Sequence, residues 1–274
     1  MENHFKLPED FERSLGIRIN NARERFIEAR DIGLKLAEGG VPLTTNPDHF
    51  AIFTDPPQLL CGPLKRLGYV AGADNRCYPS PVDGCDYINV AASLPASSIL
   101  REQGWPDHVA VVHPVDEIAC ARMFEQSYGN PFIHHITLGI QVPELAHSSG
   151  IRIAEQLLRR MAAVHARMPA ILQQDSGTLV IAVPREVLSA PEFSDRLAEW
   201  TGKLPAHQYQ LEEMEGGGYL LQFFVLRGGR IEVALRYQTQ QTFNPRSVQK
   251  ISEDELSVNQ GVLVQREMER GRSR

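Results

Sequence analysis

Two short stretches decide the fold: DHFAIFTD at residues 48–55 and HHITLGI at residues 134–140. Each places a histidine before alternating bulky apolar residues and a threonine. Alternation of this kind is typical of a strand with one buried face. Because the pattern occurs once in each half of the chain, the sequence predicts a duplicated unit. DHVAVVHP at 107–114 echoes the first stretch even more closely and competes with the second for this role.

The elements around these two stretches follow the same order in both halves. An amphipathic helix is expected over residues 8–38, ended by the glycines of EGG at 38–40. The first half then predicts strands at 48–55, 86–93 and 108–113 and helices near 59–69 and 116–130. The second half predicts strands at 132–142, 178–183 and from 229, a hairpin with glycines at 216–218, and helices at 150–167 and 190–202. The predicted class is α+β: two β-α-β-β-β-like modules forming a curled, cup-shaped mixed sheet with an N-terminal helix.

The predicted organisation is a single domain over residues 1–251. Its two modules are expected at about 41–131 and 132–251. The polar tail at 252–274 is expected to be a surface helix or partly disordered.

Composition excludes several kinds of partner. The net charge of −6 argues against a basic surface for nucleic acid. No stretch approaches the roughly 20 apolar residues of a membrane span, and the N-terminus MENHFKLPEDFERS lacks the apolar core of a signal peptide. A cytoplasmic protein with a small-molecule substrate is expected, and the oligomeric state stays open.

The four cysteines show no metal-binding or redox spacing. They are Cys61, Cys77, Cys85 and Cys120. A reducing compartment favours free, mostly buried thiols. No histidine pairs with any of them in the sequence, so they have no predicted catalytic role.

The candidate chemistry is a mononuclear metal centre with two histidines and one carboxylate. Such a triad leaves positions open on an octahedral ion, which suits O₂ and chelating substrates. The opening strands supply His49 and His135, and GRIEVALRY supplies Glu232 on a late strand. Alternation along that strand puts Glu232 on the same face as Arg236, which could orient the carboxylate or bind an acidic substrate.

The second histidine has competitors. His134 and His135 are adjacent, so strand alternation lets only one of them face the cup. If the strand at 107–114 opens the second module, His108 takes the place of His135.

Three motifs resemble a known family. DHFAIFT resembles the DHIAxRT strand, HHIT the NHFT strand and IEVALRY the YEFAKRY strand of the 2-oxoadipate dioxygenase/decarboxylase family, in the vicinal oxygen chelate superfamily. The order is the same, and the resemblance covers about residues 20–240. It implies an iron(II) centre held by His49, His135 and Glu232, in which His135 is preferred because it precedes Ile-Thr.

The resemblance breaks at one position. The family carries an arginine four residues after the first histidine, where it binds the carboxylate of a 2-oxo acid, and this chain has Phe53 there. Losing a charge-assisted contact of about 1.5–3 kcal/mol implies a different substrate. Arg236 matches the arginine of the last family motif and still suits an anionic substrate.

Three functions follow in order of preference. The first is a dioxygenase/decarboxylase, with Fe(II), acting on a small oxo- or hydroxy-acid or a related chelating substrate. The second is a non-redox isomerase, lyase or hydrolase of the same fold using Zn, Ni or Mn. The third is a non-catalytic protein that binds a small ligand.

Overall fold

The chain divides into two compact units in a computed structural model. The first unit comprises Met1–Lys6, Arg23–Asp48 and His135–Pro245, and the second comprises Leu7–Ala22, His49–His134 and Arg246–Arg274. The structure describes residues 8, 10–79, 86–95, 97–106, 108–141, 150–172, 179–184, 191–202, 209–214, 218–225, 230–238 and 249–250. The unit boundaries fall inside two strands, β1 (Leu43–Phe53) and β5 (Phe132–Ile140), so each of these strands contributes residues to both units. The modules predicted at 41–131 and 132–251 stay a prediction.

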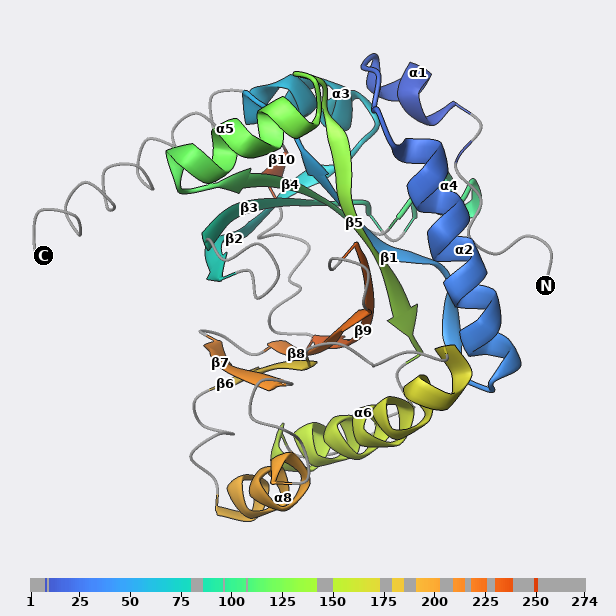
Figure 1. Cartoon of the computed structure of the whole chain (residues 1–274), viewed down its shortest axis with the longest axis vertical. Coiled ribbons are helices and arrows are strands. Elements are labelled where there is room, and N and C mark those ends of the chain that lie inside the picture. The colour runs from blue at the N-terminus through green and yellow to red at the C-terminus, as the bar shows by residue number, and fades with distance from the viewer. Residues whose placement is uncertain are drawn as a thin grey trace, which may run out of the picture. The chain divides into compact units, whose positions relative to one another are not determined.

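The first unit contains a mixed sheet in the order β1-β5-β9-β8-β6-β7. Its β5–β9 and β6–β7 pairs are parallel, and its β6–β8 and β8–β9 pairs are antiparallel. Helix α6 packs against β8 and β9, and α8 packs against α6 (Figure 1). The bounds are β6 (Leu179–Pro184), β7 (Tyr209–Met214), β8 (Gly218–Val225), β9 (Ile231–Gln238), α2 (Ala22–Glu38), α6 (Gly150–Leu172) and α8 (Pro191–Thr201).

The second unit contains the strand order β10-β2-β3-β4-β1. Within the described part of this unit, β1 and β4 pair in parallel, whereas the β10–β2, β2–β3 and β3–β4 pairs are antiparallel, and the β2 and β3 ribbons bend strongly (Figure 1). Helix α5 packs against β4. The bounds are β2 (Val70–Pro79), β3 (Asp86–Ser93), β4 (His108–Pro114), β10 (Gln249–Lys250), α1 (Phe11–Leu15), η1 (Pro57–Leu60), α3 (Cys61–Arg66), α4 (Ile99–Glu102) and α5 (Glu117–Gln126).

The predicted class is confirmed, because the structure is α+β, with parallel and antiparallel strand pairs in a curled sheet and with N-terminal helices. The strands predicted at 86–93 and 108–113 and the helix predicted at 116–130 correspond to β3, β4 and α5. The parallel β1–β4 pair brings the ends of two predicted strands to the same edge of the sheet.

The prediction of one helix over residues 8–38 is wrong. The chain forms α1 and α2 instead, separated by Gly16 with a positive φ of 68°. The Glu12 carboxylate accepts a hydrogen bond from the Ile19 backbone N–H at 2.6 Å, which stabilises the turn. Helices commonly end at a residue with the left-handed backbone conformation, which glycine adopts most easily, so α1 ends before Gly16.

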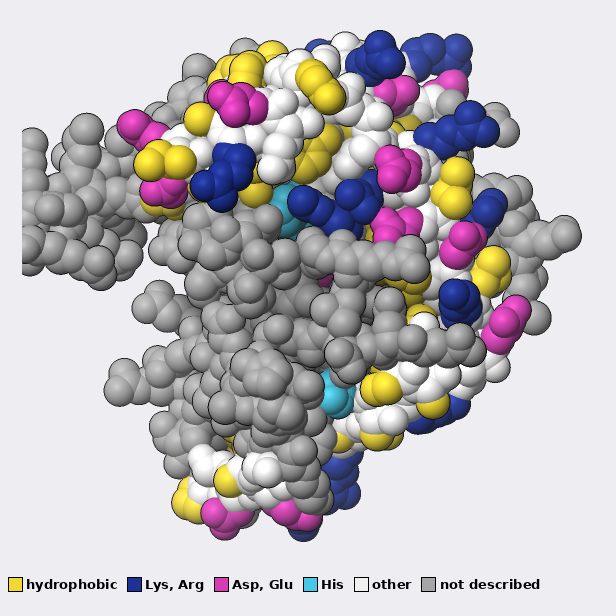
Figure 2. Space-filling view, in the orientation of Figure 1, with side chains coloured by type: hydrophobic (Ala, Val, Ile, Leu, Met, Phe, Trp, Pro, Cys, Tyr) yellow, Lys and Arg dark blue, Asp and Glu magenta, His cyan; other side chains and the backbone are white. Residues whose placement is uncertain are grey.

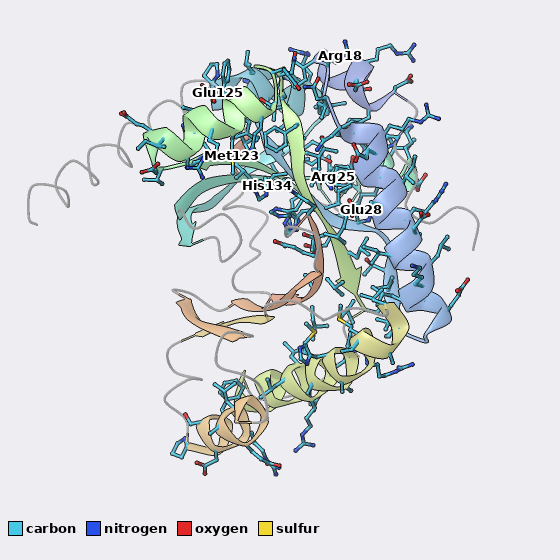
Figure 3. The ribbon with its side chains drawn as sticks, in the orientation of Figure 1. Arg18, Arg25, Glu28, Met123, Glu125 and His134 are labelled. Atoms are coloured by element: carbon cyan, nitrogen blue, oxygen red, sulfur yellow. The ribbon has the colours of Figure 1, made fainter. Side chains whose placement is uncertain are left out.

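The buried face of α2 does match the predicted periodicity. Phe26, Ala29, Ile32 and Leu36 are buried at steps of three and four residues. Basic and acidic side chains are interspersed with apolar ones on the face where α2 lies (Figure 1 and Figure 2), and the Arg25 guanidinium binds the Glu28 carboxylate at 2.7 Å (Figure 3). Within the described ranges, no helix combines the length and apolarity needed to cross a bilayer.

Candidate metal centre

The first unit brings together His135 on β5 and Glu232 on β9. The parallel register places Thr137 opposite Glu232. His135 Nε2 lies 3.4 Å from Glu232 Oε1, and the Thr137 hydroxyl donates to Glu232 Oε2 at 2.9 Å. Two residues of the adjacent strand β5 therefore contact the two oxygens of the carboxylate.

The spacing of these two side chains fits one metal ion. Bonds from a divalent ion to imidazole nitrogen or carboxylate oxygen are about 2.0–2.2 Å long, which places two such donors roughly 3.0–3.4 Å apart. The observed 3.4 Å agrees with this range. Only 3% of Glu232 is exposed, and a buried carboxylate requires hydrogen bonds and a positive partner. A cation and the Thr137 hydroxyl meet both requirements.

His49 lies on β1 within the second unit, one residue after the part of the strand that belongs to the first unit. It is buried, with 5% exposed. Its ring stacks on that of His108 at 5.2 Å between centroids, because the two residues are register partners in the parallel β1–β4 pair. The competitor His108 is thus a neighbour of His49.

The other predicted residues have different surroundings. His134 is buried in the second unit, where its ring lies 6.5 Å from that of Phe132. Arg236 lies on β9 opposite Leu220, and the structure describes it by its backbone alone. Phe53 has 1% exposed and packs in a core cluster with Ala51, Ala110, Val112 and Met123.

The structure also joins three residues that the sequence did not connect: Asp55, His113 and Cys120. Their ligand atoms all lie within 4.8 Å of one another in the second unit. His113 is the penultimate residue of β4, Asp55 lies two residues after β1, and Cys120 lies on α5. Since Phe53 pairs with Val112 in parallel register, the residues just after them meet at one edge of the sheet. A polar residue near the C-terminal end of each of two parallel strands was the available signal.

Burial controls the protonation of this cluster. Burial lowers the pKa of His113, while the Asp55 charge and the Thr54 backbone act in the opposite direction. Burial, followed by the Asp55 charge, raises the pKa of the Cys120 thiol. At neutral pH both groups are therefore uncharged, which does not favour a thiolate–imidazolium nucleophile.

No model of a known protein family matches the chain, and no curated protein matches it. Among solved structures, a mutant of 4-hydroxymandelate synthase from Streptomyces coelicolor is similar at 13% identity and a TM-score of 0.35, over 77% of this chain and 54% of that one. A methylmalonyl-CoA epimerase is similar at 15% identity and a TM-score of 0.28, over 70% of this chain and 96% of that one. The methylmalonyl-CoA epimerase from Mycobacterium tuberculosis is similar at 12% identity and a TM-score of 0.34, over 72% of this chain and 91% of that one. The chain spans about half the length of the synthase, and likenesses at these scores establish neither a family nor an activity.

Proposed function

We propose that the chain is a metal-dependent dioxygenase/decarboxylase that acts on a small oxo- or hydroxy-acid. The observation that carries the proposal is the contact of His135 with the buried, Thr137-bonded Glu232. We propose His49 as the third ligand, since it is buried and comes directly after Leu43–Asp48, the part of β1 that lies in the same unit as its neighbouring strand β5. These are the residues that the family resemblance also selects.

Each residue has a defined task in this proposal. Glu232 supplies negative charge to the ion, Thr137 fixes the carboxylate, and His135 and His49 supply neutral imidazole nitrogens. Fe(II) is the preferred ion. Two imidazoles and one carboxylate would leave open positions on it for a chelating substrate and for O₂. Arg236, from the same strand as Glu232, binds an anionic group of the substrate through its guanidinium.

Metal analysis of the purified 274-residue chain tests the centre. We expect near-stoichiometric iron after anaerobic reconstitution, and a large loss of binding in His49→Gln, His135→Gln and Glu232→Gln. His165→Gln is a matched control, because His165 is also a buried histidine but lies on α6. Thermal unfolding of each variant separates loss of the ion from loss of the fold.

Iron that is retained in the His135→Gln variant but lost in the His108→Gln variant would contradict the assignment of the second ligand. An unchanged iron content in Glu232→Gln would contradict the centre itself. It would leave the His135–Glu232 contact as an ion pair of the core.

Oxygen uptake separates the candidate activities. Iron-loaded protein supplied with 2-oxo acids or hydroxy acids should consume O₂, and Arg236→Gln should raise KM more than it lowers kcat. Turnover without O₂ in the Zn, Ni or Mn form would indicate the non-redox enzyme instead. Undiminished ligand binding by metal-free protein would indicate a binding protein.

A further inference from the structure

A second cluster of metal-ligand types lies beyond the proposed function. The structure assigns Asp55, His113 and Cys120 as a binding site for a thiophilic divalent cation such as Zn²⁺. The three residues come from the end of β1, the end of β4 and helix α5, all within the second unit. Their ligand atoms lie within 4.8 Å of one another.

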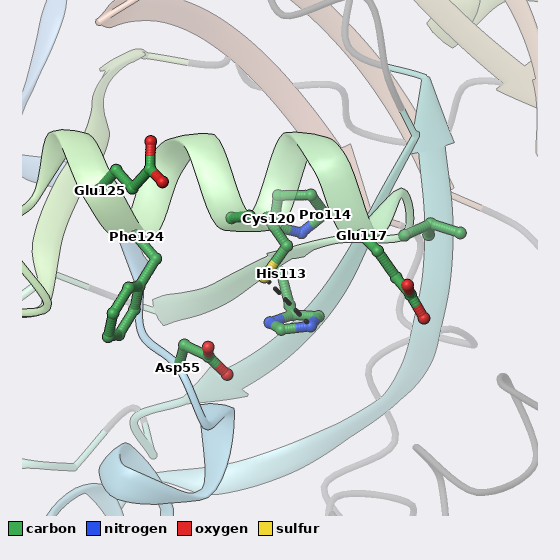
Figure 4. A pocket seen from close by; sticks show the side chains of 9 residues that line it. Asp55, His113, Pro114, Glu117, Cys120, Phe124 and Glu125 are labelled. Carbon is green, nitrogen blue, oxygen red and sulfur yellow. Dashed lines mark hydrogen bonds between the residues drawn. The ribbon is translucent and has the colours of Figure 1, made fainter.

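The spacing of sulfur and nitrogen matches a shared ion. Zinc binds thiolate at about 2.3 Å and imidazole nitrogen at about 2.0–2.1 Å, so a tetrahedral ion separates these atoms by roughly 3.5–3.6 Å. Cys120 Sγ lies 3.8 Å from His113 Nε2 (Figure 4). Nδ1 of the same ring is buried, which leaves Nε2 as the nitrogen that faces the thiol. An adjustment of a few tenths of an ångström would bring both atoms into bonding distance.

The surrounding structure holds the three side chains in place. The His113 ring stacks on Phe53 with 1° between the planes, and Cys120 packs against the core cluster that contains Phe53. The buried Thr54 hydroxyl donates to the Pro56 carbonyl at 2.6 Å, which orders the turn that carries Asp55. The Asp116 side chain caps α5 through the Ala119 N–H at 2.7 Å and so fixes the start of the helix.

A pocket adjoins the site. Asp55, His113 and Cys120 line one pocket of about 410 Å³, together with residues of α5 that include Glu117 and Glu125. Three protein ligands leave one position of a tetrahedral ion for water or a small molecule. The carboxylates of Glu117 and Glu125 add an electrostatic preference for cations.

Cobalt titration of the 274-residue chain, stripped of metal by a chelator, tests the site. A thiolate ligand gives Co²⁺ an intense near-ultraviolet charge-transfer band. The centre of His49, His135 and Glu232 has no sulfur, so it cannot produce this band. We expect the band in the native protein, its displacement by Zn²⁺, which binds more tightly than Co²⁺, and its full retention in Glu232→Gln.

Substitutions assign the ligands. Cys120→Ser should abolish the band, and Cys61→Ser, the matched control, should keep it. His113→Gln and the exposed Asp55→Asn should each weaken Co²⁺ binding at least about tenfold, with thermal unfolding close to native for Asp55→Asn. A native protein without the band, a band that persists in Cys120→Ser, or unchanged affinity in both His113→Gln and Asp55→Asn would overturn the assignment.

Discussion

At the residue scale, Thr137 controls how Glu232 presents its carboxylate. The hydroxyl donates to Oε2, and Oε1 faces His135. Thr137→Val keeps the shape of the side chain and removes the donor. Because hydrogen-bonded supports of metal ligands commonly contribute 10–100-fold to metal affinity, we expect a loss of about that size. Titration of the chelator-stripped protein with Fe(II) under anaerobic conditions measures it.

Thr54→Val is the control for this prediction. Thr54 is equally buried and also donates a hydrogen bond, but its acceptor is the Pro56 carbonyl in the second unit. Both variants should lose a similar amount of stability, and only Thr137→Val should lose affinity for iron. Equal iron affinities in the two variants would mean that Thr137 does not support the centre.

A buried imidazole on α6 makes stability depend on pH. Burial lowers the pKa of His165 below the value of 6.5 that it has in the unfolded chain. The unfolded chain therefore binds a proton that the folded chain excludes, so the free energy of unfolding rises with pH through the window below 6.5 and levels off above it. His165→Gln should remove this part of the slope.

Urea unfolding of the native protein and His165→Gln at several pH values between about 5 and 7.5 measures the difference. Subtracting the two curves cancels the contribution of the other titrating groups. Parallel curves across the whole range would show that His165 has the same pKa in the folded and unfolded states.

At the scale of elements, the close approach of β1 and β5 in the first unit depends on a glycine. A Cβ added at Gly139 would lie 2.6 Å from Thr44 Oγ1 and 3.4 Å from Thr44 Cβ. Gly139→Ala should therefore destabilise the protein by about 1–3 kcal/mol, the usual range for overpacking. Denaturant unfolding measures the change.

Thr44→Ala provides the rescue for this variant. It removes the atoms that clash and leaves the added carbon in ordinary contact with Thr44 Cβ at 3.4 Å. By itself it loses the hydroxyl bond to the Asn46 carbonyl, which contributes about 0.5–1.5 kcal/mol. The double variant should be more stable than the sum of the two single changes predicts. Strict additivity would place the strain of Gly139→Ala elsewhere.

At the scale of the whole molecule, neither unit is a continuous piece of chain. The first unit needs Arg23–Asp48 as well as His135–Pro245, which supply α2 and the first half of β1. A fragment of residues 135–245 would leave one side of β5 without its neighbouring strand and without the helix. We expect it to lack a cooperative unfolding transition.

Circular dichroism during urea unfolding tests this expectation on the fragment. As a control, residues 23–48 joined to 135–245 by a flexible linker should recover a cooperative transition, because the missing strand is restored. Cooperative unfolding of the 135–245 fragment alone would show that β1 and α2 are dispensable for this unit.

The sequence by itself determined the elements with strong periodicity. Alternation identified the strands that carry His49, His135 and Glu232, and the three-to-four-residue repeat identified the buried face of α2. These patterns are local, because each residue needs only its near neighbours in the chain to show which face is buried. The composition likewise indicated an ordinary globular protein.

Only the tertiary structure decided which polar residues meet. The parallel register of β1 and β4 places Asp55 beside His113, and the packing of α5 adds Cys120 to them. The parallel register of β5 and β9 sets Thr137 against Glu232. The break between α1 and α2 depends on the conformation of Gly16 and on a contact between Glu12 and Ile19. Register and helix packing join residues far apart in the chain, and no local pattern carries that information, because strand pairing is selected by the burial of the whole sheet.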